Sequence, residues 1–485
     1  MINLKIIYKV FGNLLILEVL LLLLCVGVGV WYKESNLGTF IWPAVATFLM
    51  AIGLKYAGRH AENRMGRRDG YLIVSMCWVV FSLVGMMPFL IGGYTTRVAA
   101  AFFESMSGFT TTGATILNGI DALPHSILFW RSLMHWLGGM GIVFFTIAVL
   151  PQMGSGDLKL FSAEATGLKI GKMHPRISTT ARWLWGIYMF LTVSCSLAYY
   201  LAGMNLFDAV NHGMSTISTG GFSTHQDSIA YFRSPLIEYI SVLFMFCGGI
   251  NFTLLYLLLV KRRWREVLRD GELRCFLLII AFVVIYSTGV LFFLHDYGLE
   301  EAFRRTIFTT IALQTTTGFT TVDFMTWHPS IWMLLLFVTI CGSCAGSTSG
   351  GVKCIRILAA FKMLKNEFRH ILHPRAVLPI RLNHSVMNNT VGQTIFAFFI
   401  AFVFIVFCST LILATMGMPL LDSLGISVTA FSNAGPSLGW QLTPLDSWAE
   451  LSDGVLWVTS FLMLAGRLEI FSILLPFIPA FWKEN

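Results

Sequence analysis

Apolar runs of about twenty residues, separated by short polar or basic segments, dominate the sequence. A helix of that length crosses the ~30 Å hydrocarbon core of a bilayer. The clearest runs are residues 14–31, 71–92, 183–202, 236–260, 275–294, 395–415 and 455–481. Hydrophobic residues make up 56% of the chain and charged residues only 12%, against roughly 25% charged in soluble domains. The sequence therefore predicts an all-α, multi-pass membrane protein.

Basic residues gather in four hydrophilic connections, which predicts how the spans are oriented. The connections hold 23 of the 33 Lys and Arg residues and cover 55–68, 159–182, 261–274 and 353–381. Cytoplasmic loops carry an excess of Lys and Arg, so we place these connections and both termini in the cytoplasm. The net charge of +8 then reflects topology. No nucleic-acid partner is expected, because no segment is long enough to form a basic soluble domain.

Four short clusters of Thr, Ser, Asn and Gly recur between these connections. Aligned on one glycine, they read FTTTGAT (109–115), TISTGGF (216–222), QTTTGFT (314–320) and FSNAGPS (431–437). The shared glycines in this alignment are Gly113, Gly220, Gly318 and Gly435. Each cluster follows a semi-apolar segment too short to span a membrane, namely 98–109, 206–217, 299–314 and 419–432. Such repetition implies one structural unit used four times.

The repeat divides the chain into five parts. Residues 1–58 form two extra N-terminal helices, and the four units cover 59–155, 156–262, 263–375 and 376–485. Each unit is a basic connection, a full span, a half-length helix, a Thr/Gly cluster and a second full span. We therefore expect ten spans and four re-entrant loops, with the four units in parallel orientation.

Irregular backbone at membrane depth survives only where it is buried in protein or lines a wet cavity. Four copies around one axis could point backbone carbonyls and Thr hydroxyls at that axis, replacing the hydration shell of an ion. The half helices would direct their partially negative C-terminal ends toward the clusters, which favours a cation. Uncharged oxygen ligands suit an alkali cation better than a transition metal. One such cluster alone would be an ordinary loop or helix break.

Four span–loop–span units, each with one filter glycine, resemble the Trk/Ktr/HKT superfamily of potassium transporters. The two extra N-terminal helices and the stretch LAGRLEIFSILLPF resemble its bacterial TrkH/TrkG branch most. The resemblance implies four pore-loop repeats around a pseudo-fourfold potassium pore. It also implies a filter at Thr111, Thr112, Gly113, Ser218, Thr219, Gly220, Thr316, Thr317, Gly318, Asn433, Ala434 and Gly435. The fourth copy departs most from the pattern, since Asn433 and Ala434 replace hydroxyl residues.

The same resemblance implies a partner, an assembly and a location. It implies a homodimer in the bacterial plasma (inner) membrane, with membrane lipid around it. It also implies a cytosolic nucleotide-binding regulatory subunit of the TrkA type. The transported ion would be K⁺, with Rb⁺ as its closest substitute, and no cofactor is expected in this chain.

A glycine-rich stretch, CGSCAGSTSGGVK (341–353), interrupts the last span of the third unit. Glycine and serine permit kinks and irregular backbone. The resemblance implies an intramembrane loop that obstructs the pore, and we assign this gate to residues 342–351, with Gly342, Gly346, Gly350 and Gly351. No other unit is expected to have such a break. Small-residue helix packing is the alternative; a phosphate-binding loop is disfavoured because the G-K-[ST] order and a preceding strand are missing.

Arg467 is a charge inside an apolar span, where charges are costly and usually functional or paired. Glu469 is too close along a helix to face it. The resemblance implies that Arg467 projects into the pore below the filter as a second gating element. The alternative is an ion pair with a carboxylate of another helix.

Two other functions remain open at this stage. A proton- or sodium-coupled secondary transporter would also use broken helices near the midplane, although it commonly shows inverted repeats. A membrane enzyme would need a catalytic constellation, and no nucleophile–base pair stands out in the sequence. We therefore expect a gated potassium uptake protein that is not an enzyme.

Overall fold

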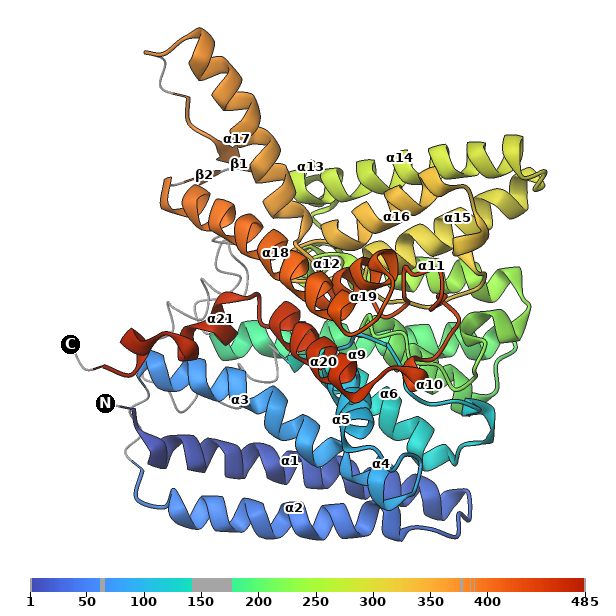
Figure 1. Cartoon of the computed structure of the whole chain (residues 1–485), viewed down its shortest axis with the longest axis vertical. Helices are drawn as coiled ribbons and strands as arrows, with labels where there is room; N and C mark the ends of the chain where they lie inside the picture. Colours follow the sequence, from blue (N-terminus) through green and yellow to red (C-terminus); the bar gives the residue numbers. More distant parts are fainter. Residues whose placement is uncertain are drawn as a thin grey trace.

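The computed structural model describes residues 2–61, 66–141, 177–375, 378–383, 385–387 and 389–483. Within the described residues, the regular secondary structure is helical apart from one short hairpin, in which β1 (Arg381–Leu382) pairs with β2 (Ser385–Val386). The helices α1 (Leu4–Trp31) and α2 (Gly38–Ala57) pack against each other along one edge of the molecule (Figure 1). They precede the first unit, as predicted, and both helices contact that unit.

Each unit contains a long first helix, a short second helix and a third helix. The long helices are α3 (Arg67–Gly85, continued by α4, Met87–Ile91), α9 (Ile177–Leu201), α14 (Gly271–Leu294) and α18 (Asn389–Thr415). The short helices are α5 (Val98–Phe109), α10 (Leu206–Ile217), α15 (Leu299–Gln314) and α19 (Leu420–Ser432). The third helices are α6 (His125–Gly139), α11 (Pro235–Gly249), α16 (Pro329–Cys341) and α20 (Asp453–Arg467). The four short helices confirm the predicted half-length segments, with Pro419 as the N-cap of α19.

The third helix is broken in three units rather than in one. Residues 236–260, predicted as one span, form α11 and α12 (Phe252–Leu259), which meet at 107°. Residues 455–481 form α20 followed by Phe471–Phe477, which includes α21 (Phe471–Leu474), with a bend of 116°. In the third unit, residues 342–353 separate α16 from α17 (Cys354–Leu372). The expectation that the other units are unbroken is therefore wrong, because two or three non-helical residues turn an apolar run without changing its hydropathy.

Helix lengths agree with a protein that crosses the membrane many times. Six described helices are long and apolar enough to span, or eight if each bent pair is one span. The third helix of the first unit is described only to residue 141, so the predicted connection 159–182 and the unit boundary at 155–156 lie mostly or wholly outside the described residues.

Both termini lie on the same side of the molecule, where α3, α14 and α18 also begin (Figure 1). Near the chain ends, the Arg68 guanidinium donates to the carbonyl of Lys483 at 2.7 Å, and the Asn3 amide donates to Asp69 at 2.9 Å. The first helices of three units therefore start from one face, which agrees with parallel repeats.

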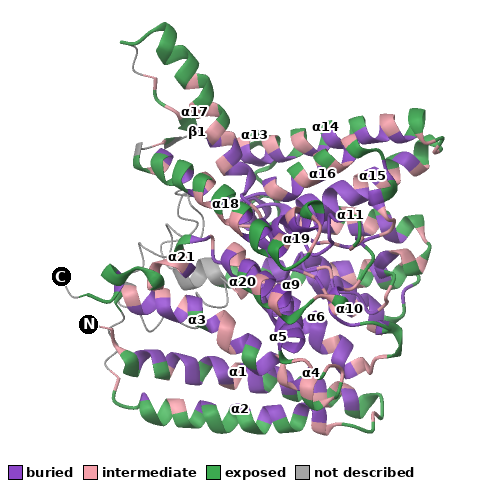
Figure 2. Cartoon of the chain, in the orientation of Figure 1, coloured by how far each residue is buried: buried purple, intermediate pink, exposed green. Residues whose placement is uncertain are grey.

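The short helices are largely buried, most completely towards their C-terminal ends. Every residue of α5 after Val98 is buried, and buried residues predominate in the centre of the molecule (Figure 2). The long helices expose large apolar side chains on their outer faces; Phe404 of α18, for example, is 65% exposed. The half-length helices thus lie mostly inside protein, which is one of the two environments at membrane depth that tolerate their irregular ends.

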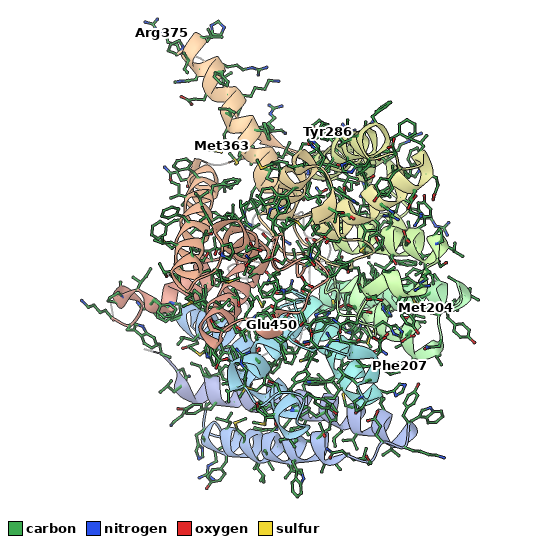
Figure 3. The ribbon with its side chains drawn as sticks, turned by 45° about the vertical axis from the view of Figure 1, so that its right-hand side comes forward. Met204, Phe207, Tyr286, Met363, Arg375 and Glu450 are labelled. Atoms are coloured by element: carbon green, nitrogen blue, oxygen red, sulfur yellow. The ribbon has the colours of Figure 1, made fainter. Side chains whose placement is uncertain are left out.

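One element leaves the compact body. The helix α17 projects outward, with Met363 along its length and Arg375 beyond its end, far from the centre (Figure 3). It carries the basic residues Lys362, Lys365 and Arg369 of the fourth basic connection.

Candidate functional site

The four short helices end in the same way, at the four predicted clusters. The residue that follows the C-terminal turn adopts a left-handed conformation, with φ between 53° and 56°, and its N–H bonds to the carbonyl three residues earlier. These residues are Thr111, Thr219, Thr316 and Asn433. Asn tolerates this conformation, but a β-branched Thr adopts it only when its surroundings force it. Strained backbone repeated at equivalent positions indicates a functional constraint.

The structure corrects the alignment of the second cluster by one residue. Two residues after each left-handed residue comes a glycine with φ between 77° and 88°, and these glycines are Gly113, Gly221, Gly318 and Gly435. The shared glycine of the second unit is therefore Gly221, and Gly220 stands where the first unit has Thr112. Ser218 accordingly corresponds to Thr110 and lies one position before the equivalent triplet. Two adjacent glycines leave this register open in the sequence, and only the backbone conformation decides it.

The four glycines close a ring of backbone contacts. A Cβ on Gly113 would lie 2.1 Å from the carbonyl oxygen of Gly220, and one on Gly221 would lie 2.0 Å from that of Thr317. The ring then continues into the last unit and returns to the first. A Cβ on Gly318 would lie 2.3 Å from the Ala434 oxygen, and one on Gly435 would lie 2.5 Å from the Thr112 oxygen. Each unit thus approaches a carbonyl of the next so closely that no side chain fits.

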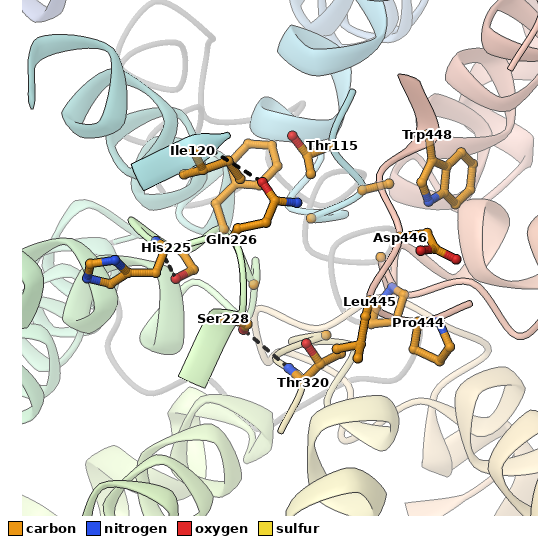
Figure 4. Close-up of a pocket in the computed structure, with 18 of the residues that line it drawn as sticks. Thr115, Ile120, His225, Gln226, Ser228, Thr320, Pro444, Leu445, Asp446 and Trp448 are labelled. Atoms are coloured by element: carbon orange, nitrogen blue, oxygen red, sulfur yellow. Dashed lines mark hydrogen bonds between the residues drawn. The ribbon is translucent and has the colours of Figure 1, made fainter. Parts of the chain in front are cut away.

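The four glycines also line one cavity, together with residues of the loops that follow the clusters (Figure 4). Its walls are mostly polar and include Asp446 and Thr320. Hydrogen bonds join neighbouring units around it: the Ile120 amide donates to Gln226 at 3.3 Å, and the Thr320 amide donates to Ser228 at 3.3 Å (Figure 4). The cavity is therefore a polar mouth shared by all four units.

A buried ion pair contacts the chain just after the first two clusters. The sequence analysis did not predict it. Arg131 of α6 is 1% exposed and lies 2.9 Å from Glu104 of α5, which is fully buried. The same carboxylate accepts the Thr115 hydroxyl at 2.9 Å, and Arg131 donates to the Ser223 carbonyl at 2.9 Å. The pair therefore joins the chain after the first cluster to the chain after the second. Two isolated charges 27 residues apart give no sequence pattern.

A second charged group lies at the rim of the mouth. His225 is 2.6 Å from Asp121 and 3.1 Å from Asp208. Burial alone would lower the pKa of His225, but its hydrogen bonds to the two carboxylates outweigh that effect and raise the pKa. Burial would raise the pKa of Asp121, but the hydrogen bond with His225 outweighs it and lowers the pKa. The group is an ion pair between two units when His225 is protonated.

On the other side of the ring, the glycine-rich stretch 342–351 forms a compact loop against three of the four clusters. The Gly350 amide donates to the Thr316 hydroxyl at 2.7 Å, and the Thr219 and Thr348 hydroxyls are 3.2 Å apart. A Cβ on Gly350 would lie 2.0 Å from the carbonyl oxygen of Ser432. The loop therefore touches the second, third and fourth clusters directly.

The folding of this loop depends on glycine and on one acidic residue. Gly342, Gly346 and Gly351 all have left-handed backbone, with φ of 65°, 73° and 75°. Glu272, at the start of α14, accepts the amides of Ala345 and of Ile355, at 2.5 Å and 3.1 Å. One carboxylate thus ties both the loop and the first turn of α17 to the first helix of the third unit. In the structure this stretch is therefore a non-helical loop rather than part of a continuous helix.

Arg467 is the last residue of α20, and its side chain contacts this loop. Its guanidinium donates to the Thr348 carbonyl at 2.8 Å and to the Gly138 carbonyl at 2.6 Å. Among the residues that the structure describes, no carboxylate forms an ion pair with Arg467, and Glu469 pairs instead with Arg356. Within the described part of the chain, Arg467 is therefore held by two backbone carbonyls rather than by an ion pair with another helix. Arg467 bridges the gate loop of the third unit and the end of α6 in the first.

Four helix–loop–helix units that close around one axis define a membrane protein of the pore-loop type, with pseudo-fourfold symmetry. The chain belongs to the TrkH family, whose model, described as a cation transport protein, matches residues 39–484. The resemblance seen in the sequence is thereby confirmed, and the chain is a transport protein rather than an enzyme.

Individual relatives extend over nearly the whole chain. It is 40% identical to the Trk system potassium uptake protein TrkH of Escherichia coli (strain K12), over 90% of each chain. It is 35% identical to the TrkH of Halomonas elongata, over 99% of this chain and 100% of that one. Its structure matches the crystal structure of the potassium transporter TrkH from Vibrio parahaemolyticus with a TM-score of 0.89, at 36% identity over 99% of both chains.

Proposed function

We propose that this protein takes up potassium ions through a selective, gated, channel-like pore. The closed ring of carbonyl–glycine contacts among four units carries the proposal, because it places equivalent backbone segments around one axis at the base of a polar mouth. The relatives are named potassium uptake proteins, and we therefore propose K⁺ as the transported ion.

The filter in this proposal is built from backbone. Its carbonyl oxygens would replace water around a dehydrated ion, and the short helices would direct their negative ends toward it. With the corrected register, the filter consists of Thr111, Thr112, Gly113, Thr219, Gly220, Gly221, Thr316, Thr317, Gly318, Asn433, Ala434 and Gly435. Ser218 leaves the set, and Gly221 enters it. The fourth unit contributes the same backbone geometry although its side chains differ.

The gate in this proposal is the loop 342–351 held by Arg467. The loop contacts three clusters directly, and the guanidinium adds a positive charge beside the same path. A passing cation would meet both a backbone obstruction and a repulsive charge. Opening would require the loop to move and Arg467 to release the Thr348 carbonyl.

The protein would act in the bacterial plasma (inner) membrane, as a homodimer, with both termini in the cytoplasm. The clustering of both termini and three basic connections on one side supports this orientation. A cytosolic nucleotide-binding subunit of the TrkA type would contact that side, and the projecting basic helix α17 is one available contact. A movement at that surface could reach the gate because α17 continues directly from the gate loop.

Cation uptake into liposomes that contain the purified protein tests the function. K⁺, Rb⁺, Na⁺ and Li⁺ are compared without any proton or sodium gradient. Selective uptake of K⁺ and Rb⁺ is expected. Uptake that occurs only with an imposed proton or sodium gradient would instead identify a coupled secondary transporter, in which the four clusters form a binding site.

A further inference from the structure

The second unit lacks a side chain at one position of the ring. The position between the left-handed residue and the glycine holds Thr112, Thr317 and Ala434 in the other units, but Gly220 in the second. In the first and third units, the Thr hydroxyl at this position lies 2.8 Å from the hydroxyl two residues earlier. These bonds brace the cluster from within its own unit, and Gly220 cannot form one.

An imidazole from the first unit occupies the place of the missing side chain. A Cβ on Gly220 would lie 2.1 Å from Nδ1, 2.4 Å from Cγ and 2.7 Å from Cε1 of His135. His135 belongs to α6 and is fully buried. The glycine and the histidine are therefore complementary, since any larger residue at position 220 would collide with the ring.

His135 also binds the backbone of the second cluster. Its Nδ1 lies 3.3 Å from the Phe222 amide and 3.2 Å from the Ser215 hydroxyl. Its ring stacks on the Phe222 ring at 4.0 Å and 13°. A backbone amide can only donate, so Nδ1 must accept and the uncharged ring carries its proton on Nε2. The histidine thus holds the segment on both sides of Gly221.

We propose that His135 is a positioning residue for cation selectivity, which rests on the proposed role of the ring as a filter. An uncharged imidazole donated by the first unit replaces the side-chain brace that the second unit lacks. It fixes the backbone from Gly220 to Phe222, and so the Gly220 carbonyl that faces Gly113 of the first unit. Selectivity by a ring of carbonyls depends on all four being held at their positions.

Substitutions at positions 135 and 220 test whether His135 positions the filter backbone or only fills space in the core. The variants are His135→Ala, Gly220→Thr and the double variant. In the double variant, the hydroxyl introduced at position 220 would face Ser218, in the same way as the Thr112 hydroxyl faces Thr110 in the first unit. His135→Phe keeps a ring but loses the acceptor, whereas His135→Asn places an amide oxygen near the position of Nδ1. Monodispersity and thermal unfolding are checked for each, and K⁺ and Na⁺ uptake are then measured separately in liposomes.

The selectivity ratio of K⁺ over Na⁺ uptake is expected to fall about fivefold in His135→Ala and His135→Phe, the effect of one lost hydrogen bond. His135→Asn should stay near the wild type, and the double variant should recover selectivity that each single change loses. An unchanged ratio in the folded Ala and Phe variants would overturn the proposal, even if the unfolding temperature falls. A wild-type ratio near one would overturn the filter itself, and with it this inference. If the Ala variant is not recovered, the Phe and Asn variants make the same comparison.

Discussion

Removal of the Arg467 guanidinium should open the pore in the absence of any partner. The two bonds that Arg467 donates, to Thr348 at 2.8 Å and to Gly138 at 2.6 Å, join the gate loop to the first unit. A hydrogen bond from a charged donor contributes about 1.5–3 kcal/mol. After the cost of burying the guanidinium, we take about 3 kcal/mol for the pair, which is about a hundredfold in the ratio of closed to open protein. Arg467→Ala should therefore raise basal K⁺ uptake by up to about a hundredfold.

Arg467→Lys separates the charge from the hydrogen bonds. Lysine keeps the positive charge but lacks the planar fork that reaches two carbonyls together, so an intermediate rise of about tenfold is expected. The assay is the initial rate of ⁸⁶Rb⁺ uptake into liposomes, normalised to the amount of reconstituted protein. Uptake by the Ala variant equal to that of the wild type would show that Arg467 does not hold the pore closed. Uptake by the Lys variant equal to that of the wild type would show that charge alone, rather than the bridge, closes the pore.

Three further changes test other parts of the structure. Glu104→Gln leaves Arg131 buried without its charge partner and should lower the free energy of unfolding by about 3–5 kcal/mol, measured by denaturation in detergent; no change would refute the buried pair. Gly350→Ala places a Cβ 2.0 Å from the Ser432 oxygen, so the loop should seat poorly and basal uptake should rise about tenfold; wild-type uptake would contradict that contact. The raised pKa of His225 means that its ion pair is fully present below about pH 6.5 and is lost as the pH rises through the raised value. The unfolding temperature of the wild type should therefore fall more than that of His225→Gln between about pH 6 and pH 9, and parallel pH profiles would contradict this.

The half-length helices could be predicted to within a residue because their signals are local. A semi-apolar segment ends at a cluster of Thr and Gly, and the helix ends at the same place in the structure. The basic connections likewise predict the orientation of the spans, because the bias towards Lys and Arg can be read from composition without knowing the packing.

Other features depend on contacts that no local pattern encodes. Gly220 and Gly221 are adjacent, so the sequence does not show which of them is the shared glycine. Position 221 requires glycine because the Thr317 carbonyl, distant in the sequence, lies close to it in space. The run 236–260 stays apolar through its bend, where the Phe252 amide donates to the Gly346 carbonyl at 3.0 Å. Hydropathy indicates that a segment lies within the membrane, but it does not indicate that the segment bends there.

In the proposed filter, four backbone carbonyls hold the transported ion on one axis. Crystals soaked in Rb⁺ or Tl⁺, with anomalous diffraction recorded for each, would locate that ion. We predict a peak on the axis, surrounded by the carbonyls of Thr112, Gly220, Thr317 and Ala434, which an excess of K⁺ in the soak displaces and an excess of Li⁺ does not. Density only away from that axis, in protein that takes up Rb⁺ in liposomes, would contradict the claim.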